Sequence, residues 1–327
     1  MGQRIDKKDM QILYEISLNA RLPNKEIAKR TGLSPPAVQQ RIRNLIDSEI
    51  ISDFMPILRV DKLGLNLYRC MFRLERASNE QEEKIIQYFL QNRNVLFLAK
   101  VTGRWDLSVN FVLKDANALF EQLKEITRKF SDNIKAYHFS LIISSVNFNK
   151  RYLSNDVGEI RKGSYTEGSN EKEKLDEKDI RILRALFENT RERYFTITRQ
   201  TGIAMQTVKG RIASMERTGV IQAYRTRINP LAFRASRKRV ALALQDVSNG
   251  EQRLMEFVQK NQHVAVFEKM VGQWNYELQV ECMGEEEFAG FLKELKDALS
   301  DVLIGYDLID VVHVELNKNA DLFSQFS

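Results

Sequence analysis

The sequence predicts an α+β protein of two tandem units, each with an N-terminal helix-turn-helix (winged-helix-like) domain followed by a ferredoxin-like βαββαβ domain. Three observations carry this prediction. The chain repeats itself after about 170 residues, since Ile5-Asp-Lys-Lys-Asp-Met-Gln-Ile-Leu13 returns as Leu175-Asp-Glu-Lys-Asp-Ile-Arg-Ile-Leu183. Within each repeat, the apolar spacing of short helices gives way to a mixture of strand and helix periodicity. A stretch rich in glycine, serine and charge separates the repeats.

The repeat continues well beyond this opening segment. Single residues return at the same offset: Asn19, Arg21, Thr31, Gly32, Val38, Arg41, Ile42 and Ile51 become Asn189, Arg191, Thr201, Gly202, Val208, Arg211, Ile212 and Ile221. One insertion or deletion then reduces the offset from 170 to 169, because Gly103-Arg104-Trp105 returns as Gly272-Gln273-Trp274. Such a period is far longer than a solenoid repeat, so the repeating object is a whole module. We expect domains at residues 1–60, 61–153, 175–230 and 231–327, with a flexible polar linker at 154–174.

The first 52 or so residues have the spacing of three short helices followed by the start of a strand. Asp6 is a suitable N-cap for the first helix, and Asn24 is a suitable N-cap for the second. Ser34 is a strong N-cap for the third helix. Pro35 follows it at the first helical position, where the missing N–H costs nothing.

From about residue 67 the periodicity changes. The pattern predicts, in order, a strand at 68–74, a helix at 79–91, strands at 95–101 and 107–113, a helix at 116–130 and a strand at 134–146. This β-α-β-β-α-β order is the ferredoxin-like split arrangement. The second unit repeats the plan, with three helices from 176 to about 217 and the mixed domain from about 238 to 314.

Composition limits the kinds of protein and site that this chain can form. Of 327 residues, 43% are hydrophobic, which is ample for packed cores, and the net charge of +6 permits a polyanionic partner without requiring one. Cys70 and Cys282 do not fall at equivalent repeat positions, which argues against a disulfide scaffold, a zinc site or a CxxC motif. We therefore expect core cysteines, no metal and no cofactor. Lacking a membrane-length apolar run and a signal-peptide region, the chain is expected to be soluble and cytoplasmic.

A helix, a tight glycine turn and a second helix form the helix-turn-helix pattern, whose second helix enters the major groove of double-stranded DNA. The predicted DNA-binding residues on these two helices are Ser34, Pro35, Pro36, Gln39, Gln40, Arg41 and Arg43 in unit one and Met205, Gln206, Lys209 and Arg211 in unit two. Gln contacts adenine bidentately, and Arg contacts guanine or phosphate. The shared Arg41 and Arg211 either contact phosphate or pin the helix. The alternative is a three-helix scaffold whose polar face is merely solvated.

The two predicted reading helices differ. Ala204 stands where unit one has the Ser34 cap, and Gly210 lies mid-helix, which costs about 1 kcal/mol relative to Ala. We expect the second helix to be less stable and a poorer base reader. Attraction to the DNA backbone is retained, because both three-helix segments carry nine Lys and Arg against six Asp and Glu.

These residues together resemble the Lrp/AsnC regulators, the feast/famine family of bacteria and archaea. The matching segments are Ile5–Leu13, Asn19-Ala-Arg21, Thr31-Gly-Leu-Ser-Pro35, Arg41–Leu45, Ile50-Ile51 and Val101–Leu107. The second unit looks like a divergent member from 175 to 316, whereas ordinary members carry one unit. The resemblance implies a regulator whose C-terminal domains dimerise through their sheets and bind amino acids or similar small molecules.

The resemblance also implies where such an effector binds, because in the family the glycine-containing turn between the second and third strands lies at the effector site. Here the turns are Gly103-Arg104-Trp105-Asp106 and Gly272-Gln273-Trp274-Asn275. The Asp106 carboxylate could accept hydrogen bonds from an ammonium group, and Asn275 lacks that charge. The alternative is purely structural: glycine suits a tight strand connection, and a strand tryptophan belongs most often to a core or an interface.

A covalent tandem raises one more expectation. The two ferredoxin-like domains can pair within one chain as a pseudo-dimer at high effective concentration, or they can pair with a second chain. Because the reading helices differ, the within-chain arrangement predicts an imperfect or asymmetric palindrome as the operator.

Two other functions remain open. Siroheme decarboxylases resemble the same regulators, include fused two-unit proteins, and depend on His and Arg near the second and third strands of the C-terminal domain. His138, His263 and His313 fall outside the corresponding stretches, 95–111 and 264–280, and we expect His263 to be solvated; the chain is therefore not expected to be an enzyme. The third possibility is an interaction protein whose helix-turn-helix domains only bridge partners, which weak, salt-insensitive DNA binding would favour.

Overall fold

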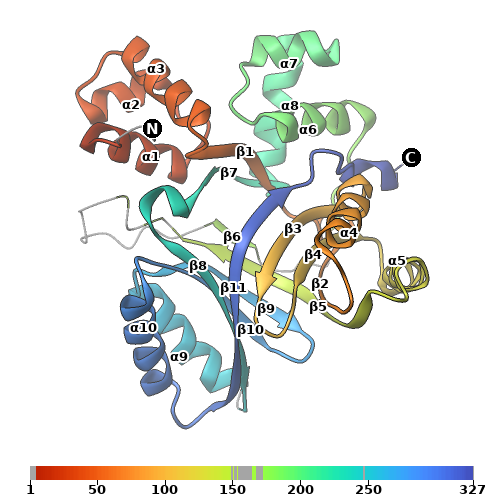
Figure 1. Ribbon diagram of the computed structural model, residues 1–327. Coiled ribbons are helices and arrows are strands. Elements are labelled where there is room, and N and C mark those ends of the chain that lie inside the picture. The colour runs from red at the N-terminus through yellow and green to blue at the C-terminus, as the bar shows by residue number, and fades with distance from the viewer. Residues whose placement is uncertain are drawn as a thin grey trace.

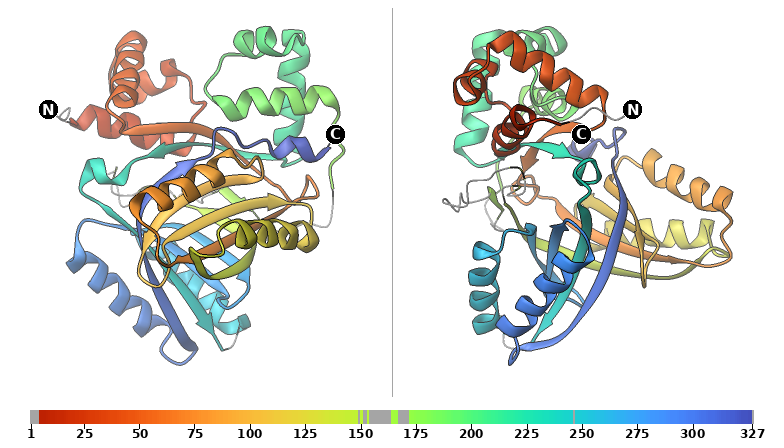
Figure 2. Two further views of the ribbon diagram at one scale, coloured as in Figure 1. Left: turned by 45° about the vertical axis from the view of Figure 1, so that its right-hand side comes forward. Right: turned by 60° about the vertical axis from the view of Figure 1, so that its left-hand side comes forward.

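The computed structural model describes residues 5–148, 150, 153, 164–166, 172–245 and 247–326. Two helix-turn-helix domains lie side by side over one end of a closed β-sheet, and the remaining long helices cover the outside of that sheet (Figure 1). The two views in Figure 2 show both domains over this same end. Within the described residues, no helix combines the length and the apolarity needed to cross a membrane.

The first helix-turn-helix domain has the three helices and the strand that the sequence predicts: α1 (Lys7–Leu18), α2 (Asn24–Thr31), α3 (Pro35–Asp47) and β1 (Ile51–Leu58). Asp6 caps α1 in a capping box, and Ser34 caps α3. The expectation that Asn24 caps α2 is wrong, because the extended Pro23 takes the cap position and Asn24 becomes the first helical residue. Gly32 ends α2 in the left-handed conformation, with φ +68°, which glycine adopts without strain.

The second helix-turn-helix domain repeats this plan with α6 (Glu177–Glu188), α7 (Tyr194–Thr201), α8 (Met205–Arg217) and β7 (Ile221–Ile228). Asp176 forms the same capping box on α6, and Gly202 makes the same left-handed turn after α7. As the sequence predicts, α8 has no side-chain cap at Ala204 and contains Gly210. The lower stability of α8 that we infer from these two residues stays a prediction.

Each mixed domain has the predicted βαββαβ order. The first comprises β2 (Asn66–Leu74), α4 (Asn79–Gln91), β3 (Val95–Thr102), β4 (Leu107–Leu113), α5 (Ala116–Lys129) and β5 (Ile134–Asn147). The second comprises β8 (Ser236–Leu244), α9 (Val247–Lys260), β9 (Val264–Val271), β10 (Tyr276–Cys282), α10 (Glu285–Ala298) and β11 (Leu303–Leu316). Short 3-10 turns, η2 (Pro230–Phe233) and η3 (Leu322–Phe326), flank the second domain. The predicted linker lies mostly outside the described residues, apart from the short strand β6 (Ser164–Thr166) and residues 172–174.

The two four-stranded sheets join at both edges into one ring. Strand β3 pairs with β11, β5 pairs with β9, and β2 pairs with both β4 and β5. The long last strands make this possible, because each begins in its own sheet and ends in that of the other unit. Thus β11 pairs with β8 up to Val311 and with β3 from Asp310 onward. The second halves of β5 and β11 close the ring, whereas their first halves, 134–140 and 303–309, pair on one side only among the described residues.

The two helix-turn-helix domains are joined by an antiparallel ribbon of β1 and β7, in which Asp53 lies opposite Arg227. The ribbon also exchanges core residues between the units. Phe54 and Leu58 of β1 pack on the core of α6–α8, and Ile228 of β7 is buried with the core of α1–α3. Consequently neither reading domain has a core made only of its own unit.

Candidate nucleic-acid interface and internal cavity

Helix α3 exposes most of the side chains that the sequence selects for reading DNA. Pro35, Pro36, Gln40 and Arg43 are exposed, and Gln39 is half-buried. Gln40 donates a hydrogen bond to Asn44 Oδ1 at 2.9 Å, one turn along the same helix. The helix is held beneath by the buried Val38, Ile42 and Leu45. The N-terminal half of α3 therefore presents amide and guanidinium donors on a rigid support.

Helix α8 exposes fewer of the selected polar side chains than α3. Met205, Gln206 and Lys209 are exposed, and the Lys209 ammonium lies 5.6 Å from the centre of the Tyr194 ring on α7. Gly210 adds no side chain to this face. The exposed face of α8 therefore carries fewer of the selected side-chain donors than that of α3, and its poorer reading of bases stays a prediction.

Arg41 and Arg211 pin the helices to their own domains. Arg41 Nη1 lies 2.8 Å from both Asp6 and Asp9, and Arg211 Nη1 lies 2.7 Å from Asp176 and 2.8 Å from Asp179. These carboxylates raise the pKa of both guanidinium groups. Of the two roles left open by the sequence, the geometry favours the anchoring one, because two carboxylates already bind each guanidinium.

A reciprocal pair of arginines clasps the two domains together. Arg21 Nη1 donates to the carbonyl oxygen of Thr190 at 2.6 Å, and Arg191 Nη1 donates to that of Ala20. Arg191 Nη2 also donates to Asn24 Oδ1 at 2.8 Å. Burial, with a smaller contribution from the nearby Arg21, lowers the pKa of Arg191 to about 10, so it remains charged at neutral pH. The clasp and the ribbon together join the domain that carries α3 to the domain that carries α8.

The clasp also forms one wall of a groove of about 680 Å³ on α3. Gln39 and Arg43 line it from α3, and Arg193 and Tyr194 line it from the start of α7. Sequence reasoning did not select Arg193, since it lies on the turn before α7 and only the folded chain brings it beside α3.

The two predicted effector turns share a structural role. Asp106 Oδ2 accepts the backbone N–H of Leu74 at 2.7 Å, and Asn275 Oδ1 accepts that of Leu244 at 2.8 Å. Both side chains thus bind the end of a neighbouring strand of their own sheet. The neutral Asn275 makes the same backbone contact as the charged Asp106. The presence of Asp106 is therefore explained by the strand contact, without an ammonium ligand.

The rest of each turn packs against the opposite unit. A Cβ on Gly103 would lie 3.2 Å from the carbonyl oxygen of Leu308, and one on Gly272 would lie 2.5 Å from Ser140 Oγ. Trp105 is buried and Trp274 half-buried, with Arg104 placed 5.2 Å from the Trp105 ring centre and Gln273 exposed. These contacts favour an interface role for the turns.

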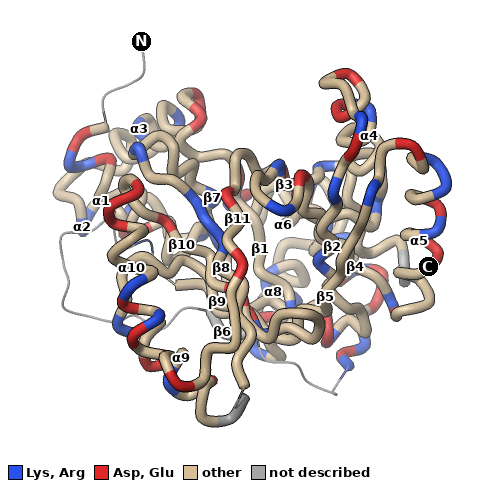
Figure 3. Tube along the Cα trace, turned by 60° about the horizontal axis from the view of Figure 1, so that its bottom comes forward, with Lys and Arg blue, Asp and Glu red and all other residues tan. Residues whose placement is uncertain are grey.

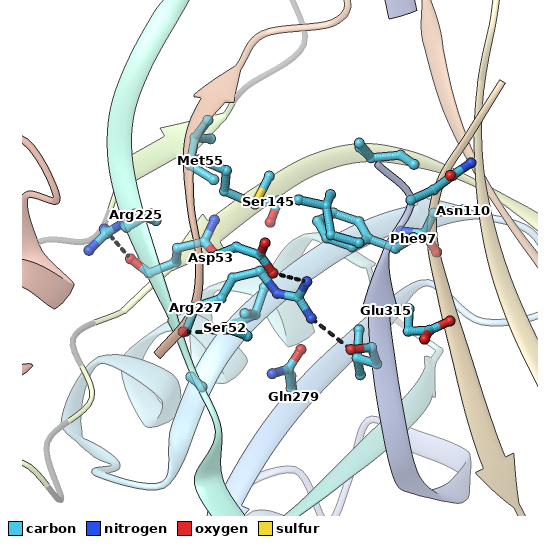
Figure 4. A pocket seen from close by; sticks show the side chains of 18 of the residues that line it. Ser52, Asp53, Met55, Phe97, Asn110, Ser145, Arg225, Arg227, Gln279 and Glu315 are labelled. Carbon is cyan, nitrogen blue, oxygen red and sulfur yellow. Dashed lines mark hydrogen bonds and ion pairs between the residues drawn. The ribbon is translucent and has the colours of Figure 1, made fainter. Parts of the chain in front are cut away.

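An internal cavity of about 1110 Å³ lies between the β1–β7 ribbon and the inner faces of the sheet ring. Figure 4 shows Arg227 reaching from β7 toward Asp53, with Phe97, Gln279 and Glu315 around it. Arg227 Nη1 lies 3.1 Å from Asp53 Oδ2, and Nη2 donates to the Val314 carbonyl at 2.9 Å. Sequence patterns did not predict this cavity, because it forms only when the sheets of both units close.

The inner faces of the ring also carry buried charged side chains. Arg69 Nη1 lies 2.6 Å from Glu268 Oε2 and 2.5 Å from Glu277 Oε1 on the other unit, and Arg239 donates to Ser108 Oγ at 2.7 Å. Such buried pairs are tolerated because each charge has partners. The run Arg237-Lys-Arg239 on β8, a blue stretch in Figure 3, is the sequence signal that could have indicated these buried charges.

A second buried group stands beside the cavity. Lys150 Nζ lies 2.6 Å from Glu281 Oε2, and Arg237 Nη2 lies 3.0 Å from Glu281 Oε1. Burial would raise the pKa of Glu281, but the two cations lower it to about 2. The carboxylate is therefore charged at all ordinary pH values.

One cluster departs from the expectation of no metal site. His263, Cys282 and Glu287 offer ligand atoms within 4.8 Å of one another. The expectation that His263 is solvated is wrong, because its side chain is 19% exposed and meets the Phe291 ring edge-on. However, burial and nearby carboxylates raise the pKa of the Cys282 thiol to about 12, and Glu287 Oε2 already accepts the Met283 N–H at 2.7 Å. A neutral thiol is a poor metal ligand.

Comparison with known proteins identifies both reading domains. Residues 5–52 match the family model described as winged helix-turn-helix DNA-binding, and residues 175–216 match the AsnC-type helix-turn-helix domain. An uncharacterized HTH-type transcriptional regulator of Pyrococcus furiosus is 30% identical over 132 residues, which is 40% of this chain and 84% of the relative. The transcriptional regulator AzlB of Bacillus subtilis is 28% identical over 116 residues, 35% of this chain and 74% of AzlB.

Among solved structures, the siroheme decarboxylase NirDL superposes with a TM-score of 0.61, over 98% of this chain and 97% of that one. At 13% sequence identity this likeness shows the fold alone. It extends over both units, so the tandem arrangement itself has a precedent.

Proposed function

Because this chain belongs to the Lrp/AsnC family of transcriptional regulators, we propose that its two units act as one covalent pseudo-dimer that reads an asymmetric operator. The observation that carries the proposal is the pair of unlike reading helices held by one ribbon and one clasp. Helix α3 offers Gln39, Gln40 and Arg43, whereas α8 offers Gln206 and Lys209. Amide and guanidinium groups discriminate base edges, and a lone ammonium contacts mainly phosphate.

The pseudo-dimer proposal draws support from the sheet ring. A family dimer would use identical sheet edges from two chains, and here β3–β11 and β5–β9 use the edges within one chain. The half-sites bound by α3 and α8 then differ in sequence. We propose that α3 supplies most of the base specificity and that α8 supplies mainly backbone affinity.

In vitro selection of bound DNA at near-physiological salt tests this directly. The full chain should enrich a motif with two unlike half-sites, the stronger lost in Gln39→Ala/Arg43→Ala and the weaker in Gln206→Ala/Lys209→Ala. Affinity should fall steeply as salt rises, since Lys and Arg displace counterions from DNA. A perfectly symmetric enriched site would exclude the within-chain pseudo-dimer. Weak, salt-insensitive binding without enrichment would favour the partner-bridging alternative.

A siroheme-decarboxylating enzyme is the second candidate, favoured by the whole-chain likeness to NirDL. We propose that this chain lacks that activity. Neither His138 nor His313 lies on the second or third strand of its mixed domain, where the decarboxylases have their histidines. His138 lies on β5, half-buried beside Trp105 and Ser140. His313 lies on β11, lines the cavity and is 61% exposed. Anaerobic incubation with siroheme, followed by mass analysis of the tetrapyrrole, decides the matter: loss of carboxyl groups would establish the enzyme.

A further inference from the structure

The cavity between the ribbon and the ring is lined by two chemically unlike sets of residues, because the two units diverge where they line it. Three cavity positions of unit two are basic, and the equivalent positions 170 residues earlier are apolar: Arg225, Arg227 and Arg237 correspond to Met55, Ile57 and Leu67. All six residues line the cavity. A dimer of identical units would contribute two matching sets of residues. The covalent tandem thus lines one space with a basic wall (Arg225, Arg227 and Arg237) and an apolar wall (Met55, Ile57 and Leu67), which adjoin where Arg225 lies opposite Met55 in the β1–β7 ribbon.

The basic wall is well held and carries an excess of positive charge. Seven Lys and Arg against five Asp and Glu line the cavity. Arg225 Nη1 donates to the Ser17 carbonyl at 2.8 Å, and its Nη2 donates to that of Asn147 at 3.1 Å. Burial lowers the pKa of Arg225 to about 10, so the guanidinium stays charged at neutral pH.

A buried hydroxyl on the same cavity has no partner among the described residues. Ser144 on β5 is 3% exposed and lines the cavity, and its Oγ has no hydrogen bond within the described part of the chain. A buried hydroxyl without a partner costs free energy, so such atoms are normally satisfied by water or a ligand. Gln279 and Asn110, labelled in Figure 4, add amide groups to the lining.

The apolar wall offers a surface for a hydrocarbon or ring. Met55 and Phe97, labelled in Figure 4, are apolar side chains that line the cavity on either side of Arg227, and the Arg227 guanidinium is 5.4 Å from the centre of the Phe97 ring. At about 1110 Å³ the cavity is as large as the upper range of ordinary ligand sites.

We propose that this cavity binds a small amphipathic carboxylate, with its acid groups toward Arg225, Arg227 and the Ser144 hydroxyl and its apolar body against Met55 and Phe97. The site is distinct from the Gly103 and Gly272 turns. Guanidinium groups bind carboxylates through paired, charge-assisted hydrogen bonds, and the apolar wall selects against small inorganic anions.

The position of the basic wall also couples ligand binding to DNA binding, and this part rests on the proposed function. Arg225 joins α1 to β7 and β5, and Arg227 joins β7 to β1 and β11. A ligand carboxylate that draws either guanidinium away changes how the ribbon sits on the ring. Because the ribbon carries both reading domains, ligand binding alters the spacing of α3 and α8.

Calorimetry and thermal unfolding of the full chain without DNA test the binding itself. The probes are 2-benzylsuccinate, its neutral diamide and inorganic phosphate, within a wider panel of aromatic and aliphatic dicarboxylates at millimolar concentration. A dicarboxylate should raise the unfolding temperature, and the diamide and phosphate should not. Ser144→Ala should weaken binding by about tenfold without loss of stability, and Arg227→Met by tenfold or more, which are the losses expected for hydrogen bonds to a charged group. Arg128→Met, on the exposed face of α5, is the matched control and should bind normally.

Three results would overturn the proposal: no dicarboxylate binds, the diamide or phosphate binds equally well, or both cavity variants keep the wild-type affinity. Ser144→Ala keeps the test decisive if Arg227→Met fails to fold. Repeating the operator titration with the best dicarboxylate tests the coupling separately. Binding without an effect on DNA would refute the coupling alone, and a failure to bind DNA leaves the cavity result intact.

Discussion

Glu281 gives the sharpest quantitative prediction, because it is a buried carboxylate between two cations, Lys150 and Arg237. Its pKa falls from the ordinary value of 4.5 to about 2 in the folded chain. One pKa unit corresponds to about 1.4 kcal/mol, so ionised Glu281 stabilises the fold by on the order of 3 kcal/mol at pH 7. A carboxylate with a lowered folded pKa contributes stability above its unfolded pKa and loses it as pH falls through the folded value. About half of the stabilisation by ionised Glu281 should therefore remain near pH 3.

Glu281→Gln mimics the protonated state and leaves two buried cations without their carboxylate, so we expect a loss of roughly 3–5 kcal/mol at neutral pH. Urea unfolding of both proteins from pH 7 down to pH 3 measures the difference. The gap should narrow as pH falls, because wild-type Glu281 begins to take up a proton. Glu285→Gln is the control, since Glu285 is an exposed partner of Lys238 and its removal should matter little. A gap that is constant with pH would refute the reasoning.

Three further predictions concern the reading domains. Arg191→Ala removes donors to the Ala20 carbonyl and Asn24; it should lower stability by roughly 2 kcal/mol and weaken operator binding, and unchanged urea midpoints would contradict the clasp. Ala204→Ser should raise the stability of the second domain by about 1 kcal/mol through a new N-cap, and Ser34→Ala should cost the first domain a similar amount, both measured by hydrogen exchange. Gly210→Ala should stabilise α8 by up to about 1 kcal/mol, because the added Cβ meets no atom within 4 Å; a destabilised variant would exclude this.

Local patterns were sufficient for most of the fold. The spacing of apolar residues predicts the helix 79–91 and the strand 107–113 at the bounds that the structure has. Cap chemistry places the starts of α1 and α3 at Asp6 and Ser34, because these signals act within one helical turn. The error at Asn24 arose because α2 begins one residue earlier than its cap chemistry indicates: Pro23 takes the cap position through its extended backbone, without a side-chain hydrogen bond.

The candidate sites were less predictable because they depend on contacts between residues that are distant in sequence. Arg41 was selected as a DNA contact or an anchor, and only its distance to Asp9 decides in favour of anchoring. Asp106 looked available for a ligand, yet the fold uses it to bind the Leu74 backbone. The cavity and the group around Glu281 join residues separated by more than 100 positions, a range over which periodicity carries no information.

The closed ring has a consequence for biosynthesis. Strand β3 ends at Thr102, and its neighbour β11 ends at Leu316, so the ribosome must add more than 200 residues before the pair can form. At typical elongation speeds this takes about 10–40 s. During that interval the outer strands of the first half have unsatisfied backbone groups, which invite pairing with other nascent chains. We expect this protein to need chaperone holding during translation, and we expect slow codons placed before residue 303 to lower its yield.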